Sequence, residues 1–375
     1  MSKRIVFLTG TRADFGKIKS LLAAVDAHPD YELHLFVTGM HMMEVYGYTL
    51  IEVQRTGYGQ IHTFSNHTDE ATMELTLAKT ISGFSDFVRA YKPDLVVVHG
   101  DRVEALAGAI VGSLNNILVA HIEGGELSGT IDELLRHATS KMSHIHLVAN
   151  EEAEKRLLQM GESPDSVTVI GSPDIDIMLS DKLPDLVEVR RHYDLEFDRY
   201  GVVLFHPVTT EYEQMASHAD NFVKALLQDD RNYVVIYPNN DMGSQSILAA
   251  YQRLNGHSRF KIYPSVRFEY FLTLLKHAEL IIGNSSAGIR EAPYYGVPTI
   301  NIGSRQDNRS VHAHIQHTSY DPTDIINALN KVNSVPVETD DSFGNGQSSQ
   351  LFMQQLNRSE FWRINPQKQF VDRNE

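Results

Sequence analysis

The 375-residue chain contains no cysteine and no long apolar run. The missing thiols exclude disulfides, cysteine nucleophiles and zinc or iron–sulfur sites with cysteine ligands, and they fit a reducing compartment. No apolar stretch approaches the roughly 18 residues of a membrane-spanning helix. The N-terminus lacks the apolar core and the cleavage site of a secretory signal. We therefore expect a cytoplasmic protein that does not insert into a membrane.

Positive charge is also scarce. The chain has 33 Lys and Arg against 48 Asp and Glu, which gives a formal net charge of −15. An acidic surface repels the phosphates of nucleic acid, so nucleic acid is not an expected partner. Because domains commonly hold about 100–200 residues, the length indicates two domains with ample core.

Short apolar runs recur along the chain, and most are soon followed by Gly, Asn or Pro. They are β-branched and continuous, which is typical of strands buried on both faces of a parallel sheet. These runs are 5–8, 33–37, 95–98, 117–122, 144–148, 167–170, 202–205, 233–237, 260–263, 280–282 and 299–302. Helical segments are predicted between them at 14–27, 103–114, 131–143, 152–160, 213–228 and 270–277. The alternation predicts an α/β fold with doubly wound sheets.

One charged stretch interrupts this alternation. Residues 172–200 contain two prolines and no strand-like run, so they are interpreted as a hinge between two Rossmann-like halves. The predicted organisation is an N-terminal domain over 1–171, a linker over 172–200, a second domain over 201–350 and a tail over 351–375. The apolar side chains of that tail are expected to pack back on the body of the protein.

Polar residues directly after the predicted strands mark the candidate site, because open α/β sheets bind ligands beyond the carboxyl ends of their strands. The first strand leads into the turn 10–16, which contains Arg12 and matches neither G-x-G-x-x-G nor the Walker A pattern. This turn is either an anion site made of backbone N–H groups and a cation, or a tight turn with a surface arginine.

Three carboxylates follow in the same half. Asp101 comes after a strand and is either a general acid or base, or a helix cap. Glu123 lies in a Gly-rich acidic stretch after the next strand, which is a ligand loop or a flexible acidic loop. Asp132 belongs to a capping box, but it lies close in sequence to Glu123. Carboxylates that converge on one site raise the pKa of some members, which suits proton transfer near neutral pH.

The second half contains a candidate anion site at 283–293. Ser285, Ser286 and Gly288 open a predicted helix after an apolar strand, which favours phosphate binding; serine capping is the alternative. Glu291 is placed to hold ribose hydroxyls. His206 follows another strand and either donates to a phosphate or is structural, and Arg305 adds a cation.

No metal site is expected. The D-x-D sequence at Asp174 and Asp176 lies in the presumed hinge, and His312, His314 and His317 have no matching carboxylate set. The histidines are interpreted as a solvated loop.

The segments 10–16, 37–41, 99–102, 121–130 and 284–298, in this order, resemble the UDP-N-acetylglucosamine 2-epimerases, specifically the hydrolysing bacterial enzymes of sialic acid synthesis. The resemblance implies a GT-B-like fold with the active site in the cleft between two Rossmann-like domains. It implies conversion of UDP-N-acetylglucosamine and water into UDP and N-acetylmannosamine, by elimination of UDP to 2-acetamidoglucal and hydration with inversion at C2. It also implies a homodimer and no cofactor.

The resemblance further implies residue roles. Asp101, Glu123 and Asp132 are the catalytic carboxylates. On the UDP side it implies Arg12 and His206 at the diphosphate, Ser285, Ser286 and Gly288 at the helix N-terminus, Glu291 at ribose, Ser265, Arg267 and Phe268 near uracil, and Arg305. Alternatives are a non-hydrolysing 2-epimerase, a hydrolysing epimerase of a modified UDP-sugar, a GT-B glycosyltransferase and a non-catalytic sugar-nucleotide-binding regulator. The stretch 121–129 looks more like the enzymes for plain N-acetylglucosamine.

Overall fold

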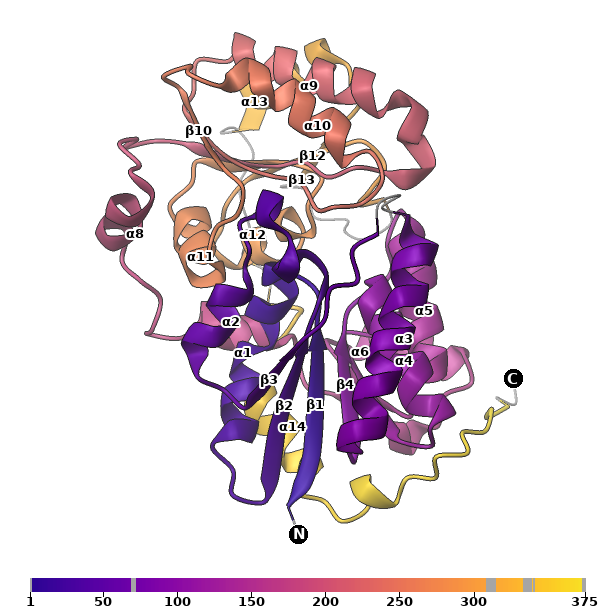
Figure 1. Ribbon diagram of the computed structural model, residues 1–375. Helices are drawn as coiled ribbons and strands as arrows, with labels where there is room; N and C mark the ends of the chain where they lie inside the picture. Colours follow the sequence, from indigo (N-terminus) through magenta and orange to yellow (C-terminus); the bar gives the residue numbers. More distant parts are fainter. Residues whose placement is uncertain (1, 69–71, 308–314, 333–338, 340, 373–375) are drawn as a thin grey trace. The chain divides into compact units, whose positions relative to one another are not determined.

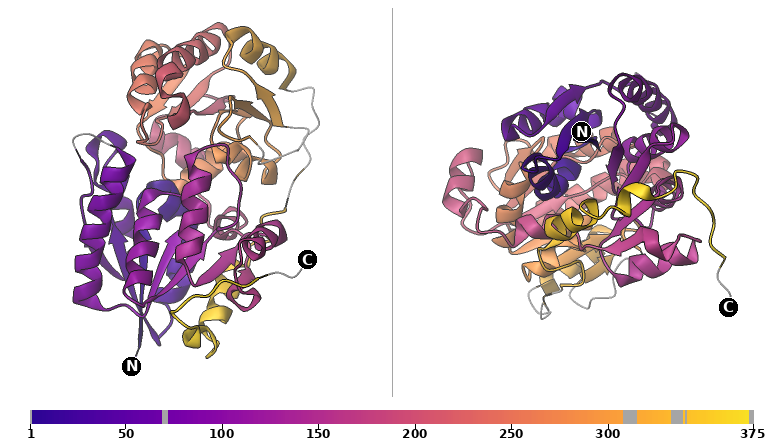
Figure 2. Two further views of the ribbon diagram at one scale, coloured as in Figure 1. Left: turned by 90° about the vertical axis from the view of Figure 1, so that its right-hand side faces the viewer. Right: turned by 90° about the horizontal axis from the view of Figure 1, so that it is seen from below.

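The computed structural model describes residues 2–68, 72–307, 315–332, 339 and 341–372. The chain forms two compact units, each an open parallel sheet covered by helices (Figures 1 and 2). Unit 1 contains Met1–Glu126, Asp132–Asp181 and Ser342–Glu375, and unit 2 contains Leu127–Ile131 and Lys182–Asp341. The α/β class with two doubly wound sheets is confirmed.

These ranges differ from the predicted domain boundaries in two places. The stretch 342–350 belongs to unit 1 because α14 (Ser348–Leu356) packs on the first sheet. The predicted linker is divided at Asp181 and contains α7 (Pro173–Met178) and α8 (Leu186–Tyr193). α7 begins at Pro173, and Pro184 precedes the residue that caps α8, so the charged stretch forms helices and no strand.

The sheet of unit 1 has the order β3-β2-β1-β4-β5-β6-β7, with every pairing parallel. Its strands are β1 Lys3–Thr9, β2 Tyr31–Val37, β3 Gln60–Thr63, β4 Leu95–His99, β5 Leu118–Ile122, β6 Ile145–Val148 and β7 Val167–Val169. The remaining helices of unit 1 are α1 Arg12–Asp26, α2 Leu50–Thr56, α3 Met73–Tyr91, α4 Val103–Leu114, α5 Ile131–Met142 and α6 Glu151–Gln159.

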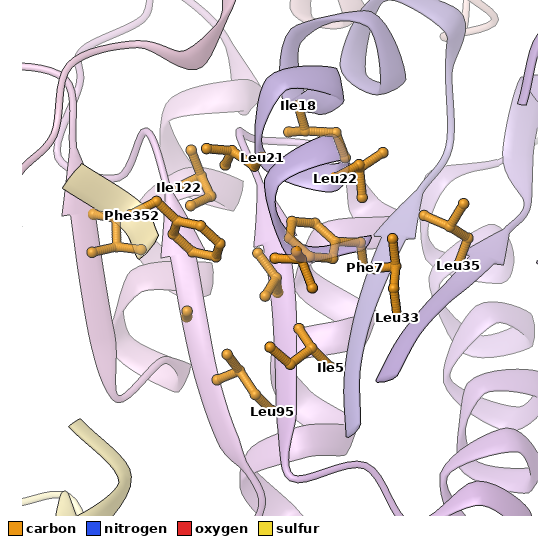
Figure 3. Close-up of a cluster of buried hydrophobic side chains, with 14 of the residues drawn as sticks. Ile5, Phe7, Ile18, Leu21, Leu22, Leu33, Leu35, Leu95, Ile122 and Phe352 are labelled. Atoms are coloured by element: carbon orange, nitrogen blue, oxygen red, sulfur yellow. The ribbon is translucent and has the colours of Figure 1, made fainter. Parts of the chain in front are cut away.

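Two apolar layers cover this sheet because successive strand residues face opposite sides. Ile5 and Phe7 of β1 pack with α1 and with Phe352 of α14 (Figure 3). Val6 and Leu8 pack on the other side with residues of α3 and α4. Phe352 is fully buried, so this part of the predicted tail is an integral part of the core.

The sheet of unit 2 has the order β10-β9-β8-β11-β12-β13, again all parallel. Its strands are β8 Gly201–Leu204, β9 Tyr233–Ile236, β10 Phe260–Tyr263, β11 Leu280–Gly283, β12 Thr299–Ile302 and β13 Ile315–Thr318. Its helices besides α8 are α9 Met215–Gln228, α10 Ser244–Tyr251, α11 Phe268–Lys276, α12 Glu291–Tyr294 and α13 Pro322–Lys331. Both sheets place the carboxyl ends of their strands at one edge, where polar loops follow.

Each of the eleven predicted strand positions overlaps a strand of the structure. The two strands missed, β3 and β13, are edge strands with mixed polar sequences, so a search for continuous apolar runs passes over them. Among the described residues no helix is long and apolar enough to cross a membrane.

Candidate active site

Two of the three predicted carboxylates in unit 1 stand at the ends of adjacent strands. Asp101 follows β4 and Glu123 follows β5, and these strands pair through His99 and Ile122. Asp132 lies in the first turn of α5, and Arg136 lies one turn later on that helix. Residues four apart share a helix face, so the contact of Arg136 with Asp101 brings all three carboxylates to one edge of the sheet.

Arg136 forms an ion pair with Asp101. Its Nη2 contacts Asp101 Oδ2, and the arginine side chain is only 3% exposed whereas that of Asp101 is 25% exposed. A buried guanidinium holds the carboxylate in place, and the open side of Asp101 can face a ligand.

Glu123 is buried and has a left-handed backbone conformation with φ of 61°. A residue with a side chain rarely adopts this region, and such strain concentrates at functional sites. The backbone N–H of Glu123 donates to Leu147 O at 3.0 Å, and the hydroxyl of Ser172 donates to Glu123 Oε1. These contacts keep the carboxylate aimed in one direction.

His99 lies between two carboxylates. Its Nε2 is 3.2 Å from Glu123 Oε2, and its Nδ1 is 3.6 Å from Asp14 Oδ1. Burial alone lowers the pKa of His99, but the charge of Glu123 and the contacts with Asp14 outweigh it and raise the pKa to about 9. His99 is therefore an imidazolium at neutral pH, and it balances the negative charge of this cluster.

The turn that contains Arg12 is built by Asp14. Its Oδ2 accepts from Gly10 N at 2.8 Å and from Thr9 Oγ1 at 2.9 Å, while Thr11 caps α1. Arg12 is the first residue of α1 and is partly exposed. The same aspartate that contacts His99 thus shapes the predicted anion turn, so the turn and Glu123 belong to one polar network.

The buried side chain of Glu104 lies beside the turn that contains Arg12. Glu104 contacts Arg102 Nε at 3.2 Å and accepts from Asn66 Nδ2 at 3.3 Å. A Cβ on Gly39, whose φ is 62°, would lie 2.5 Å from Gly10 O and 2.7 Å from Glu104 Oε1. Only glycine fits there, which accounts for the glycine in the 37–41 motif.

His121 is a structural histidine. It is fully buried, with Nε2 2.7 Å from Gly100 O and Nδ1 3.0 Å from Ser140 Oγ. Burial lowers its pKa to about 3, so the ring is neutral. It joins the loop before Asp101 to α5, which supports the geometry of the carboxylates without supplying a charge.

In unit 2 His206 follows β8, and Asn284 positions it. The amide of Asn284 accepts from His206 N at 2.6 Å and donates to His206 O at 2.8 Å. Asn239 N donates to His206 Nδ1 at 3.0 Å. With Nδ1 acting as an acceptor, the proton of a neutral ring is on Nε2, which makes His206 a hydrogen-bond donor.

The helix predicted to open after β11 is divided into two short elements. A 3₁₀ turn covers Ser286–Gly288, Ser285 caps it, and α12 has only four residues. Such short elements have little macrodipole, so an anion here would rely on individual N–H and hydroxyl groups. Ser285 and Ser286 are partly exposed, whereas Gly288 and Glu291 are buried.

The remaining predicted UDP contacts differ in exposure. Arg305 Nη1 donates to Asn284 O at 3.2 Å, which places it beside the His206 loop. Ser265 and Arg267 are partly exposed, and Tyr193 Oη accepts from Arg267 N at 2.9 Å. Phe268 is 5% exposed and begins α11, so its ring belongs to the core.

The D-x-D sequence and the histidines at 312–317, which are not expected to bind a metal, include residues with structural contacts. Lys17 pairs with Asp174 at 3.0 Å, and Asp176 accepts from the N–H groups of Ser348 and Ser349 at the start of α14. His317 Nδ1 lies 3.0 Å from Asn301 Nδ2, while His312 and His314 lie outside the described residues. In the part of the chain that the structure describes, no cluster of three metal-ligating side chains occurs.

Sequence reasoning missed three residues that organise these sites: His99, Ser172 and Asn284. His99 and Asn284 directly follow or end predicted strands, so their position was a usable signal. Ser172 lies 49 residues from Glu123 in sequence, and no local pattern links the two.

Comparison with known proteins gives a consistent result. The family model described as UDP-N-acetylglucosamine 2-epimerase matches residues 23–357. The chain is 51% identical to the UDP-N-acetylglucosamine 2-epimerase of Neisseria meningitidis serogroup B, over 99% of this chain and 100% of the relative. It is 31% identical to the hydrolyzing UDP-N,N'-diacetylbacillosamine 2-epimerase of Legionella pneumophila (95% and 96% covered) and 34% identical to polysialic acid biosynthesis protein P7 of Escherichia coli (88% and 85% covered).

Solved structures show the same fold. The UDP-GlcNAc 2-epimerase of Methanocaldococcus jannaschii, in complex with UDP-GlcNAc and UDP, has a TM-score of 0.80 at 22% identity and covers 94% of this chain and 99% of its own. The predicted GT-B-like fold class is confirmed by this likeness.

Proposed function

The chain belongs to the UDP-N-acetylglucosamine 2-epimerase family, and from that premise we propose that it is the hydrolysing form, which converts UDP-N-acetylglucosamine and water into UDP and N-acetylmannosamine. The observation that carries the proposal is the cluster of Asp101, Glu123 and Asp132 at one sheet edge, with Arg136 and His99 paired to two of its members. Relatives named as hydrolyzing and as polysialic acid biosynthetic support it. The product would feed sialic acid and capsule synthesis in the cytoplasm.

The first half of the proposed reaction is an elimination. A carboxylate removes the proton from C2 of the sugar, the C1–O bond breaks, and the electron pair leaves with UDP to give 2-acetamidoglucal. General bases contribute about 10²–10⁴-fold to such steps. Glu123 and Asp101 are each fixed by a cationic partner. Because the carboxylate is already ordered, it loses little side-chain entropy when it approaches the C2 hydrogen.

The second half is a hydration. A carboxylate accepts a proton from water as the oxygen adds to C1, and an acid returns a proton to C2 on the opposite face. The three carboxylates suffice for these transfers between them. They also stabilise the positive character that develops at C1.

The departing diphosphate needs neutral donors and cations. We propose that His206 Nε2–H, Ser285 and Ser286 bind its oxygens, that Arg305 and Arg12 add charge, and that Glu291 and the segment 265–268 serve the nucleoside. The hydrogen bond from Asn239 N to His206 Nδ1 supports this role, because it leaves Nε2–H of a neutral ring as the donor. Gly288 lets the turn pack against Thr299, where a Cβ would lie 2.6 Å from the methyl group.

The test is incubation with UDP-N-acetylglucosamine in D₂O, followed by NMR. We expect free UDP and N-acetylmannosamine with deuterium at C2. UDP-N-acetylmannosamine with its nucleotide attached would instead establish the non-hydrolysing reaction. Retention of hydrogen at C2 with transfer of the sugar to an acceptor would establish a glycosyltransferase, and binding of UDP without turnover would establish a regulator.

A second substrate is favoured by one observation, the 31% identity to the diacetylbacillosamine enzyme across 95% of the chain. Parallel assays with both UDP-sugars decide between them through kcat/KM. We expect plain UDP-N-acetylglucosamine to be preferred, as the stretch 121–129 indicates. A higher value for the bacillosamine derivative would reverse that assignment.

A further inference from the structure

A half-buried lysine near the C-terminus contacts the end of the helix that supplies Asp132 and Arg136. Lys368 Nζ donates to the carbonyls of Ser140, Lys141 and Ser143, at 3.0, 3.1 and 2.6 Å. These carbonyls belong to the last turn of α5 and the residues after it. The last carbonyls of a helix lack partners in the helix and hold partial negative charge, so a cation there is stabilising.

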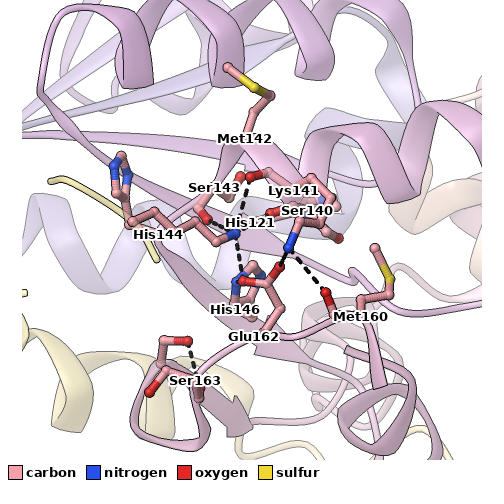
Figure 4. Close-up of polar contacts among 12 residues, drawn as sticks. His121, Ser140, Lys141, Met142, Ser143, His144, His146, Met160, Glu162 and Ser163 are labelled. Atoms are coloured by element: carbon pink, nitrogen blue, oxygen red, sulfur yellow. Dashed lines mark hydrogen bonds and ion pairs between the residues drawn. The ribbon is translucent and has the colours of Figure 1, made fainter. Parts of the chain in front are cut away.

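Glu162 holds this lysine in place. Its buried carboxylate forms ion pairs with Lys368 and with Lys141 at 2.7 Å, and it accepts a hydrogen bond from His146 Nε2 at 2.9 Å. Figure 4 shows Lys141 and His146 directed toward Glu162 beneath the end of α5. Burial raises the pKa of Glu162, but the contacts with His146, Lys141 and Lys368 outweigh it and lower the pKa to about 2. The carboxylate is charged throughout the physiological range.

Apart from the contacts of Lys368, few interactions hold the C-terminal segment in its position. The residues from 365 to 372 are exposed apart from Lys368, and they form no helix or strand. Pro366 O contacts His144 Nε2 at 3.0 Å, and Val371 N donates to Gly161 O at 3.0 Å. Phe370 is 63% exposed although it covers Gly161. An extended segment with so little apolar burial depends on the half-buried Lys368 for its attachment.

The other end of α5 is where position matters for chemistry. Asp132 is in the first turn, and Arg136 holds Asp101 from the second turn. A helix of twelve residues is a stiff rod, so a shift at its last turn moves both side chains together. Displacements near 1 Å at reacting groups can cost about 10²-fold in rate.

We propose that Lys368 is a positioning residue that fixes α5 along its axis and so places Asp132 and the Arg136–Asp101 pair for the reaction. The C-terminal segment is then part of the catalytic apparatus although it lies at the opposite end of the helix. The proposal rests on the proposed function of these carboxylates.

The test compares K368M with K368R and with K155M. Lys155 is an exposed lysine of α6 paired with Glu152, so K155M makes the same chemical change away from the contacts of α5. We expect K368M to lower kcat about tenfold while KM and the Kd for UDP stay within about twofold, K368R to retain most activity, and K155M to match wild type. Amide hydrogen exchange over 131–143 should accelerate in K368M alone.

Two results would overturn the proposal. One is a K368M enzyme with wild-type kcat and unchanged exchange in α5. The other is a loss of kcat and of UDP affinity in equal proportion to a fall in Tm, which would show a general loss of folded protein. If wild-type protein releases no N-acetylmannosamine, the proposed function fails, and the exchange experiment still decides whether Lys368 fixes α5.

Discussion

The two units have different side chains at the carboxyl-terminal edges of their sheets. Unit 1 fills the ends of β4 and β5 with buried charges, where Glu123 meets His99 and Asp101 meets Arg136. Unit 2 places neutral groups at the ends of β8 and β11, where Asn284 orients His206 through its backbone. Both sheets are parallel, and both have the topology that directs loops to this edge.

The difference fits the two tasks that we propose for the units. Proton transfer requires side chains that change charge, and opposite charges nearby set when they do so. Binding a diphosphate that is already charged requires donors of fixed geometry, which cost no protonation energy. The contrast teaches that one fold can divide a reaction between a charged edge and a neutral edge.

Neutralising the charged edge should produce the largest effect. D101N, E123Q and D132N should each lower kcat by about 10²–10⁴-fold, because an amide cannot exchange the proton. UDP affinity should change by no more than about threefold, since these residues lie outside the UDP-binding set. Steady-state UDP release and calorimetry with UDP measure the two quantities.

E133Q is the matched control for these variants. Glu133 neighbours Asp132 on α5, but its side chain is 37% exposed and pairs only loosely with His137, at 3.9 Å. Its substitution should leave kcat near the wild-type value. A carboxylate variant with near-normal kcat, or one that loses UDP binding to the same degree, would contradict the division between the two edges.

The pH dependence of stability should come next. The folded pKa of His99 is about 9, above its usual value of 6.5. Its stabilising contribution is therefore complete below about pH 6.5 and is lost as pH rises through about 9, and it amounts to on the order of 3 kcal/mol. Urea unfolding near neutral pH and near pH 10 should show that H99Q loses less stability than wild type.

H137Q provides the comparison for this measurement. Burial lowers the pKa of His137, so its titration affects stability only at lower pH, and the variant should keep the alkaline decline of wild type. An H99Q protein that declines as steeply as wild type would mean that the charged edge does not depend on its imidazolium.

The neutral edge is tested by N284A. Removing the amide leaves the backbone of His206 without two hydrogen bonds, so the His206 loop loses this support, whereas the contact of Arg305 with the main-chain carbonyl of residue 284 remains. The Kd for UDP should rise by about ten- to thirtyfold, which corresponds to two modest hydrogen bonds. Calorimetry with UDP checks this.

N232A removes a comparable amide from the opposite end of β9, where Asn232 Nδ2 donates to Arg199 O at 3.1 Å. Its UDP affinity should equal that of wild type. Equal losses in both variants would show that N284A acts through the stability of unit 2 instead of through the site.

The smallest expected effect belongs to S286A. One hydroxyl donor to a phosphate is removed, so the Kd for UDP should rise by about three- to tenfold while kcat changes little. S258A, at an exposed position before β10, serves as the control. An S286A enzyme that binds UDP normally would remove this hydroxyl from the proposed site.

The sequence predicted the strands well because buried parallel strands are continuous apolar runs, and it predicted Asp101, Glu123 and His206 as polar residues after such runs. It did not predict the edge strands β3 and β13, whose mostly polar residues lack that signal. It predicted a helix that opens at Ser285 and Ser286 after β11, where the structure has a short 3₁₀ turn and a four-residue helix.

Composition, hydrophobic runs and motif order by themselves determined the α/β class, the two sheets and the family, since these depend on local patterns along the chain. Only the tertiary structure decided which charges meet. The contacts of Ser172 with Glu123, of Arg136 with Asp101 and of Lys368 with the end of α5 span 35 to 228 residues. No local periodicity encodes such pairs, because burial and strand order bring them together only when the sheet has formed.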